Sequence, residues 1–300
     1  MHPLRTLHLA AWVYGCCLAS SACAALVSDF ADFSLRSGTT TLLPGRLYIP
    51  PETVSQPDVE RPLILFLHGS GESGTNNTAQ VNGNIDNLLR HSKTNGAFLY
   101  APQTNAGWSS GAILDRVGSM IDQALAQYPV DPRRVYVTGL SMGGGGTWNM
   151  LSRFPERFAA GVPICAVWPT ASFNPTEVGE IPIWAFHARD DGVVPVQATR
   201  DVINALLGPA GEPLPLYPPL PPATVTSDFN YASSELDLMY SEYRFGGHGI
   251  WGRVYFNPGL YEWMFAHSTI PEPASALTAL LALVAMASNV RHRRPRAACA

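Results

Sequence analysis

A serine lies at the centre of a glycine-framed pentapeptide, Gly139-Leu-Ser-Met-Gly143. The pentapeptide follows an apolar run at residues 134–138 and precedes a helix-compatible stretch at residues 147–153. A serine on a sharp turn between a strand and a helix exposes its hydroxyl above the sheet, close to the amides of the helix N-terminus. Glycine and serine are also common in loops, so the order of strand, turn and helix is what makes Ser141 the candidate nucleophile.

A nucleophilic serine needs an imidazole as its base and a carboxylate that orients the imidazole. His248 lies between glycines, just past the last predicted strand, and such a loop can bring its ring close to the serine. The alternative for His248 is a surface histidine in a glycine-rich turn. Two adjacent acids, Asp190 and Asp191, follow an earlier predicted strand and are the candidate carboxylates.

Glycines also follow the continuous apolar run at residues 62–68, in the segment His68-Gly-Ser-Gly-Glu-Ser-Gly74. They let backbone amides turn toward a developing negative oxygen. We expect the amides of Ser70 and Met142 to form an oxyanion hole, with Gly71 as the fallback for Ser70. A simple turn after a strand is the alternative for residues 72–74.

Four tryptophans, at positions 108, 168, 184 and 251, supply aromatic surface for an acyl or sugar cleft. We select Trp108 and Trp251 as substrate-binding residues, since core packing better explains Trp184. No metal site is predicted, because no second ligand lies at a zinc-like spacing from His187. Cys165 ends an apolar run and is expected to be a small buried hydrophobe.

Apolar runs alternate with helical patterns, which predicts an α/β fold with a mostly parallel central sheet and helices on both faces. A chain of 300 residues with 46% apolar composition fits one such domain. The expected elements are a hairpin pair at 41–49, strands at 62–68, 97–102, 134–138, 158–164, 181–186 and 239–244, and helices at 110–128 and 196–207. Residues 131–134 read as a turn.

A proline-rich insertion is expected at residues 208–235, and its part at 208–222 reads as an irregular surface loop, because prolines interrupt helices and sheets. This loop is either a lid over a cleft or a plain surface loop, and the sequence does not distinguish the two.

Both ends of the chain resemble targeting segments. Residues 1–24 carry an apolar stretch and an Ala-x-Ala pattern at 22–24, as in a secretory signal peptide cleaved after Ala24. A lipoprotein signal centred on Cys23 is the less favoured alternative, because Ser20 stands where a leucine-like residue is expected. At the other end, Pro271-Glu-Pro273, an uncharged stretch to position 290 and an arginine cluster at 291–296 have the lengths and charges of a transmembrane tail.

The C-terminal layout resembles the PEP-CTERM sorting signal of Gram-negative envelope proteins. This resemblance implies export, membrane attachment through residues 271–300, and an exosortase-type processing protease as a partner. The remaining domain, residues 25–270, carries 14 basic against 22 acidic residues, which argues against nucleic acid as a partner. Cys165 is its only cysteine, which excludes a disulfide framework.

Most of residues 60–265 resembles the phospholipase/carboxylesterase-like "predicted peptidase" group of α/β-hydrolases, which is similar to polyhydroxybutyrate depolymerases and to feruloyl and acetylxylan esterases. The resemblance is carried by the motifs at residues 67–74, 101–103, 138–144, 146–148, 158–165, 182–187 and 247–263. In many α/β-hydrolases the acid lies in a His-Gly-x-x-Asp-x-x-Val-Pro segment. Alignment on His187 and Val194 places that acid at Asp191, although Ala188 replaces the glycine, and Asp190 is then a solvated turn residue or a helix cap.

The resemblance implies an exported serine hydrolase that cleaves carboxylic esters through Ser141, Asp191 and His248, without a metal or an organic cofactor. The expected substrate is a small ester or an acylated polysaccharide. A peptidase or an acyltransferase built on the same residues is one alternative. A carbohydrate-binding protein of the cell envelope that has no catalytic activity is another, of a different class.

Overall fold

The computed structural model describes residues 27–220 and 227–269. The predicted signal peptide and sorting tail lie outside the described residues. In the described part, a nine-stranded sheet has the order β1-β4-β6-β5-β7-β8-β9-β11-β10. Strands β6, β5, β7, β8, β9 and β11 are mutually parallel. Strands β4 and β10 run antiparallel to them at the two sides, and β1 pairs antiparallel with β4 at the edge. The predicted mostly parallel α/β sheet is therefore confirmed.

The strands of this sheet are β1 (Ala31–Asp32), β4 (Gly45–Tyr48), β5 (Arg61–Leu67), β6 (Phe98–Pro102), β7 (Val130–Leu140), β8 (Ala160–Ile164), β9 (Ile183–Ala188), β10 (Phe229–Ala232) and β11 (Leu238–Tyr243). The α-helices are α1 (Glu52–Ser55), α2 (Asp86–Asn95), α3 (Gly111–Gln127), α4 (Met142–Arg153), α5 (Pro175–Gly179), α6 (Gln197–Ala210), α7 (Trp251–Phe256) and α8 (Pro258–Ala266). Short 3₁₀ turns include η2 (Ser70–Glu72) and η6 (Gly247–Gly249).

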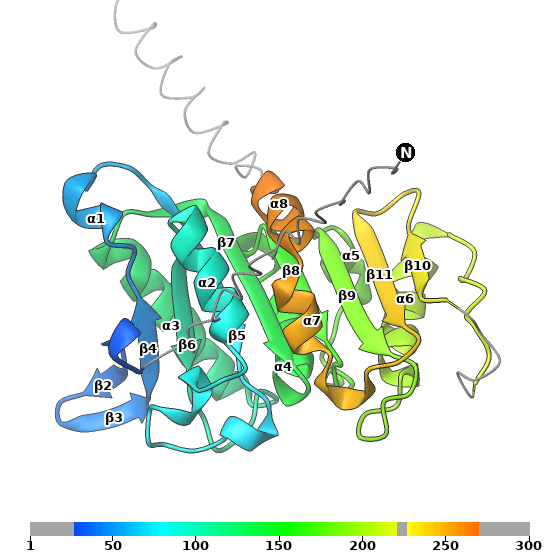
Figure 1. Ribbon diagram of the computed structural model, residues 1–300, viewed down its shortest axis with the longest axis horizontal. Helices are drawn as coiled ribbons and strands as arrows, with labels where there is room; N and C mark the ends of the chain where they lie inside the picture. Colours follow the sequence, from blue (N-terminus) through cyan, green and yellow to red (C-terminus); the bar gives the residue numbers. More distant parts are fainter. Residues whose placement is uncertain (1–26, 221–226, 270–300) are drawn as a thin grey trace, which may run out of the picture.

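Helices cover both faces of the sheet, as predicted. Figure 1 shows α2, α7 and α8 in front of the strands and α3, α4, α5 and α6 behind them. Each face carries its own apolar core, one built with residues of α3, α4 and α6 and the other with residues of α2, α7 and α8. Strand β5 shows the effect of this double cover, since residues 63–67 are at most 1% exposed. A continuous apolar run is the pattern expected of a parallel strand buried on both faces.

The predicted hairpin over residues 41–49 is wrong. Strand β3 (Thr40–Leu43) pairs with β2 (Leu35–Ser37) in a separate small sheet, whereas β4 pairs with β1 and β6. Gly45 explains the separation, because a Cβ there would collide with the carbonyl of Phe33 and the ring of Tyr100. The backbone of β4 is thus packed tightly into the main sheet, and β3 is left to pair with β2.

Two further expectations need correction. The turn predicted at 131–134 lies inside β7, where a register shift in the β5–β7 pairing absorbs the irregularity. The predicted insertion contains regular structure, because α6 continues to Ala210 with Pro209 inside it, and β10 pairs with β11. A proline in the last turn of a helix removes only one hydrogen bond close to the end, and Gly211, with φ 71°, then terminates the helix. Residues 212–219 form no helix or strand, as predicted.

Within the described ranges, no helix is both long enough and apolar enough to cross a bilayer. The transmembrane segment predicted in the C-terminal tail falls outside those ranges.

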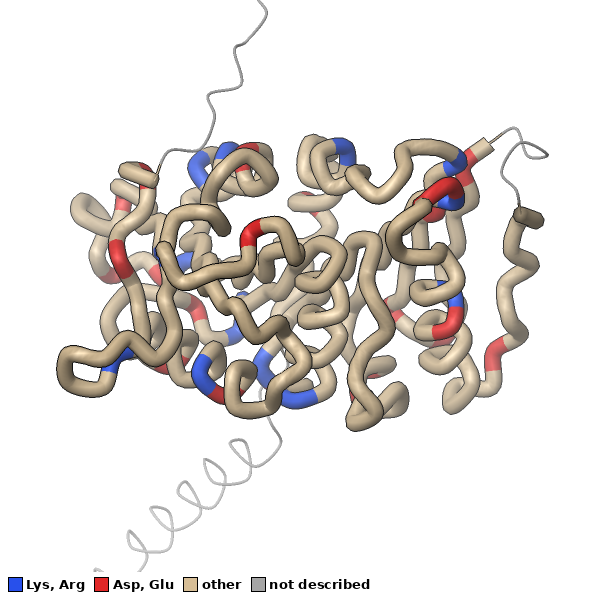
Figure 2. Tube along the Cα trace, turned by 90° about the horizontal axis from the view of Figure 1, so that it is seen from below, with Lys and Arg blue, Asp and Glu red and all other residues tan. Residues whose placement is uncertain are grey.

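The carboxyl ends of the parallel strands lie at one edge of the sheet, the lower edge in Figure 1. Figure 2 looks onto the molecule from this side and shows basic and acidic residues interspersed around a largely uncharged face. In open α/β sheets, ligands bind outside this edge. The loops that follow β5, β7, β9 and β11 are therefore where a functional site is expected.

Candidate active site

Ser141 occupies a strained turn between β7 and α4. Its φ of 55° and ψ of −116° lie outside the regions that ordinary residues prefer, and its side chain is almost fully buried. The flanking glycines make the turn possible. A Cβ on Gly139 would collide with the carbonyl of Gly143, and a Cβ on Gly143 would collide with the carbonyl of Leu67. The structure thus has the sharp strand-to-helix turn that the sequence predicts, and only glycines fit at positions 139 and 143 of this turn.

A continuous chain of hydrogen bonds joins the serine, the late histidine and one of the two acids. His248 Nε2 lies 2.8 Å from Ser141 Oγ, and His248 Nδ1 lies 2.7 Å from Asp191 Oδ2. Since an ionised carboxylate only accepts hydrogen bonds, Nδ1 carries the proton and Nε2 is free to accept one from the serine. The three residues come from loops after β7, β9 and β11, so the sheet brings together side chains that are far apart in the sequence.

Asp191 accepts hydrogen bonds on both carboxylate oxygens, although its side chain is fully buried. The amides of Val193 and Val194 donate to Oδ1 at 2.8 and 2.9 Å, and His187 Nε2 lies 3.2 Å from Oδ2. Burial alone raises the pKa of Asp191, but the hydrogen bonds from His187, His248 and the two amides outweigh it and hold that pKa well below its usual value. The carboxylate stays ionised at neutral pH, as a partner for an imidazolium requires.

Asp190 lies on the surface and does not face His248. Its two carboxylate oxygens accept hydrogen bonds from the amides of Gly246 and Gly247, at 3.3 and 2.8 Å. These amides immediately precede His248, so Asp190 anchors the loop that carries the histidine. From the sequence, Asp190 is a candidate acid or, once Asp191 takes that role, a solvated turn residue or helix cap. The sequence does not indicate its anchoring role, because its partners lie more than fifty positions further along the chain.

Cys165 lies beside the acid and is buried, as expected. Its thiol, with Asp191 and His248, forms a group whose ligand atoms all lie within 4.8 Å of one another. This set does not suit a cation, because the acid and the imidazole are already in direct hydrogen-bond contact. Burial, with the nearby charge of Asp191, also raises the pKa of the Cys165 thiol, so the thiolate that a metal needs is disfavoured.

The loop after β5 lies directly against the serine turn, because Leu67 pairs with Gly139. Met142 is the first residue of α4, where helix amides have no partner within the helix. Ser70 begins the 3₁₀ turn η2 in the facing loop. The two amides selected from the sequence, with Gly71 next to Ser70, therefore belong to neighbouring segments near the nucleophile.

Buried side chains hold this loop in place. The amide of Thr104 donates to His68 Nε2 at 3.1 Å, so Nδ1 carries the proton and donates to the carbonyl of Gly69 at 2.7 Å. Burial lowers the pKa of His68, which favours this neutral form. Trp108 Nε1 donates to the carbonyl of His68 at 3.0 Å.

Trp108, selected from the sequence as a substrate-binding residue, lies among the residues that line a cavity next to Met142. It is only 1% exposed and offers almost no surface to a ligand, because its ring packs in the core and its indole N–H supports the loop after β5. Trp251 is half-buried and lies edge-on to the ring of His248, with the centroids 5.6 Å apart. Its Nε1 donates to Asn84 at 2.9 Å, which orients the indole next to the imidazole.

A cavity of about 430 Å³ opens next to Met142. Trp168 lines it, with 49% of its surface exposed, and donates from Nε1 to Asp201. Asn149 also lines it and is fixed by bonds to Trp108 and Thr170. The cavity thus offers an aromatic face and an oriented amide beside the nucleophile.

No protein-family model matches the chain. The chain is similar to the bifunctional acetylxylan esterase/xylanase XynS20E of Neocallimastix patriciarum, with 29% identity over 148 residues that cover 48% of this chain and 21% of the relative. It is also similar to the poly(3-hydroxybutyrate) depolymerase of Ralstonia pickettii, with 30% identity over 172 residues that cover 51% of this chain and 34% of the relative. The chain thus spans about a third or less of the length of these relatives.

Among solved structures, the chain resembles a thermostable esterase, with a TM-score of 0.65 and 33% identity over 81% of this chain and 64% of that chain. This similarity and the strand order together confirm the predicted α/β-hydrolase fold.

Proposed function

We propose that this chain is a serine hydrolase of carboxylic esters, with Ser141 as nucleophile, His248 as base and Asp191 as the acid that orients the base. The observation that carries the proposal is the continuous hydrogen-bond chain from Ser141 Oγ through His248 to the buried carboxylate. The names of the relatives, an acetylxylan esterase and a polyester depolymerase, support ester chemistry.

In the proposed reaction, His248 Nε2 accepts the hydroxyl proton as Ser141 Oγ attacks the ester carbonyl carbon. The carbonyl oxygen becomes negative and accepts hydrogen bonds from the amides of Met142 and Ser70, with Gly71 as the fallback for Ser70. One such donor contributes roughly 3 kcal/mol to lowering the barrier. His248 then protonates the departing alcohol, which leaves an acyl-enzyme, and water repeats the attack to release the acid.

The proposed substrates are small esters or acylated polysaccharides. The cavity beside Met142 supports this choice, because the exposed face of Trp168 can stack on an apolar or sugar ring and Asn149 supplies a fixed polar contact. Trp251 borders the site from the side of His248 and is proposed as a second contact.

Export is part of the same proposal and rests on the sequence pattern at residues 1–24 and 271–300. An exosortase-type protease would process the tail, and the enzyme would act in the envelope or outside a Gram-negative-type cell. The mass of the protein recovered from the producing cell tests this directly. A recovered chain that still carries both segments contradicts it.

Hydrolysis of p-nitrophenyl acetate tests the catalytic assignment. We expect Ser141→Ala in the full chain to lower kcat by roughly 10⁴-fold or more, because the nucleophile is lost. Ser119→Ala is the matched control, since Ser119 is exposed on α3, remote from the site. Unchanged turnover in Ser141→Ala would remove Ser141 from the mechanism.

A fluorophosphonate probe provides a second, covalent readout that does not depend on the choice of ester. We expect it to label the wild-type protein and to leave Ser141→Ala unlabelled. Faster cleavage of peptide anilides than of matched esters would move the assignment to a peptidase. Preferential transfer of the acyl group to an added alcohol would move it to an acyltransferase.

A further inference from the structure

A second cavity, of about 400 Å³, lies at the same edge of the sheet, beside β4 and the end of β6. Its lining includes three arginines, Arg36, Arg46 and Arg116, but one acid, Asp32. The hydrolysis proposed above uses none of these residues. An excess of guanidinium groups in a concave site points to an anionic ligand.

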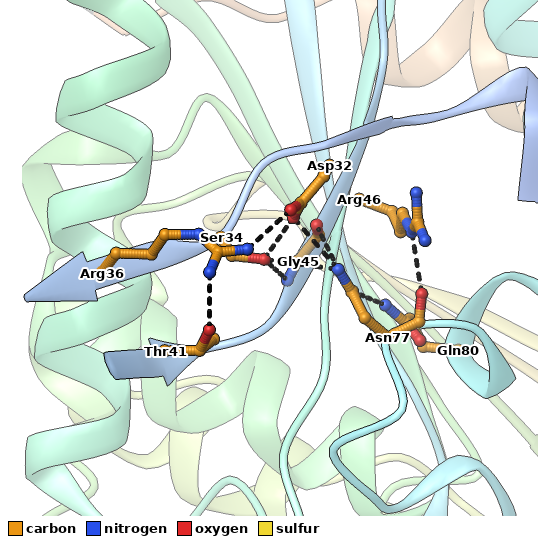
Figure 3. A network of polar contacts seen from close by, with 8 residues as sticks. All are labelled: Asp32, Ser34, Arg36, Thr41, Gly45, Arg46, Asn77 and Gln80. Atoms are coloured by element: carbon orange, nitrogen blue, oxygen red, sulfur yellow. Dashed lines mark hydrogen bonds and ion pairs between the residues drawn. The ribbon is translucent and has the colours of Figure 1, made fainter. Parts of the chain in front are cut away.

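The one acid in the cavity is already satisfied. Arg36 forms an ion pair with Asp32 at 2.8 Å, and Ser34 and Asn77 also donate to the Asp32 carboxylate, as Figure 3 shows. These contacts balance the charge of Arg36 and occupy the acceptors of Asp32. Two positive charges therefore remain without a matching acid in the lining.

Arg46 and Arg116 are each fixed by a backbone carbonyl. Arg46 Nε donates to Asn77 O at 2.8 Å, and Arg116 Nη1 donates to Leu42 O at 2.9 Å. In the part of the chain that the structure describes, neither arginine lies within 4 Å of a carboxylate. A guanidinium has five N–H donors, so each arginine keeps donors for a ligand.

The wall of the cavity is cross-linked around Asn77. Asn77 Nδ2 donates to the carbonyl of Gly45 at 3.1 Å, and the backbone N–H of Asn77 donates to Gln103 Oε1 at 2.6 Å. Gln80 Nε2 donates to Asn77 Oδ1 at 2.7 Å (Figure 3). These bonds connect the start of β4, the loop after η2 and the end of β6. The arginines are thus held on a rigid wall, which lowers the entropy lost when a ligand binds.

The cavity lies at a defined distance from the proposed nucleophile. The strand order β7-β5-β6-β4 puts three inter-strand steps between the turn that carries Ser141 and the start of β4. At about 4.8 Å a step, the separation is roughly 15 Å. Asn105 lines both this cavity and the one beside Met142, so the two are neighbours along the same edge.

We propose that the arginine cavity binds a carboxylate of the substrate, carried on a saccharide chain roughly 15 Å from the ester that Ser141 attacks. Arginine pairs with carboxylates through two parallel hydrogen bonds, and the sugar hydroxyls would find partners in the exposed Thr41 and Thr75 of the lining. The inference rests on the proposed ester hydrolysis and makes it more specific: acidic saccharide esters are preferred over neutral ones. Phosphate shares this chemistry and is separated by the experiment.

The test compares two acetylated xylo-oligosaccharides of equal length, one with a glucuronate branch and one without. We expect the full-length wild type to show a kcat/KM roughly tenfold higher for the acidic oligomer, the effect of one charged hydrogen-bonded contact. Arg46→Gln and Arg116→Gln are each expected to remove most of this preference through KM and to leave turnover of the neutral oligomer unchanged. Arg133→Gln, at the opposite end of β7, is the matched control and keeps the preference.

Equal kcat/KM for the two oligomers in the wild type overturns the proposal, as does a preference that persists in the Arg46→Gln/Arg116→Gln double variant. Circular dichroism of each variant checks that the fold is retained. Arg46→Lys, which keeps the charge, is expected to recover part of the preference that Arg46→Gln removes.

Calorimetry with the unacetylated glucuronate-bearing oligomer separates the two proposals. If no ester is hydrolysed, the proposed function fails, yet binding that weakens at least fivefold in Arg46→Gln still supports the cavity. Binding of inorganic phosphate without binding of this oligomer rules out the carboxylate assignment.

Discussion

Asp191 and Asp190 are chemically identical neighbours, and the structure gives them different partners. Asp191 is buried and faces His248, whereas Asp190 lies on the surface and accepts the amides before that histidine. Their difference follows from the backbone after β9, which turns one carboxylate into the site and the other toward the loop after β11.

This arrangement predicts unequal effects of the same substitution. Asp191→Asn is expected to lower kcat by roughly 10⁴-fold, because the amide can donate to Nδ1 and favour the wrong tautomer of His248. Asp190→Asn keeps a side-chain oxygen that can accept the hydrogen bond from the amide of Gly247. Its kcat should therefore fall by no more than a few-fold. Steady-state kinetics on one p-nitrophenyl ester measures both, and equal losses would show that the roles of the two acids are misassigned.

His187 also contacts the carboxylate of Asp191. It is fully buried, its Nε2 reaches both Asp191 Oδ2 and the carbonyl of Val194, and its Nδ1 lies 2.8 Å from Thr199 Oγ1. These contacts are those of a residue that positions the acid loop.

At the scale of elements, the turn from β7 into α4 depends on close backbone packing against β5. Gly143→Ala would drive a Cβ into the carbonyl of Leu67, and backbone atoms cannot move aside as a flexible side chain can. We expect this variant to lose about 1–3 kcal/mol of unfolding free energy or more. Its activity should fall as well, because the amide of Met142 shifts with the start of the helix.

Gly252→Ala provides the opposite expectation within another helix. Gly252 lies in α7 with open space around the position of a Cβ, so alanine should raise the unfolding free energy by up to about 1 kcal/mol through helix propensity. Thermal unfolding of both variants tests the pair. A Gly143→Ala protein as stable as the wild type would contradict the close packing between α4 and β5.

At the scale of the whole molecule, a buried ionic cluster next to the loop of Asp191 joins β9, β11 and α6. Glu242 on β11 accepts from Arg189, just after β9, and from Arg200 on α6, all at 2.7 Å. Burial raises the pKa of Glu242, but the hydrogen bonds from Arg200 and Arg189 outweigh it, so the pKa in the folded protein is lowered.

A carboxyl group whose folded pKa is lowered stabilises the fold fully above its unfolded pKa of about 4.3 and loses that contribution as the pH falls through the folded value. Urea unfolding should therefore show a nearly constant contribution from Glu242 between pH 7 and roughly pH 5, and a decline below that. Glu242→Gln is expected to cost about 3–5 kcal/mol at pH 7, because two buried guanidinium groups lose their counter-charge. The unfolding free energy of the variant should also fall less steeply below pH 5 than that of the wild type. An unchanged pH dependence would show that Glu242 does not cause the decline.

Much of the molecule follows from the sequence alone. The alternation of apolar runs and helical patterns predicted the parallel sheet and its covering helices, because each element buries its own face according to a local period. The glycine-framed turn and the glycine-flanked imidazole selected Ser141 and His248, and the resemblance to the acid segment of α/β-hydrolases selected Asp191. The structure brings these three side chains within hydrogen-bond distance.

Other features were decided only by the tertiary structure. The pairing of β4 with β6 in place of β3, the burial of Trp108, the anchoring role of Asp190 and the arginine cavity each depend on residues that meet across strands and loops far apart in the chain. A local pattern specifies the conformation of a segment, but the partner of a side chain depends on which segments the sheet sets next to it. That neighbourhood is set by global packing, which no single stretch of sequence contains.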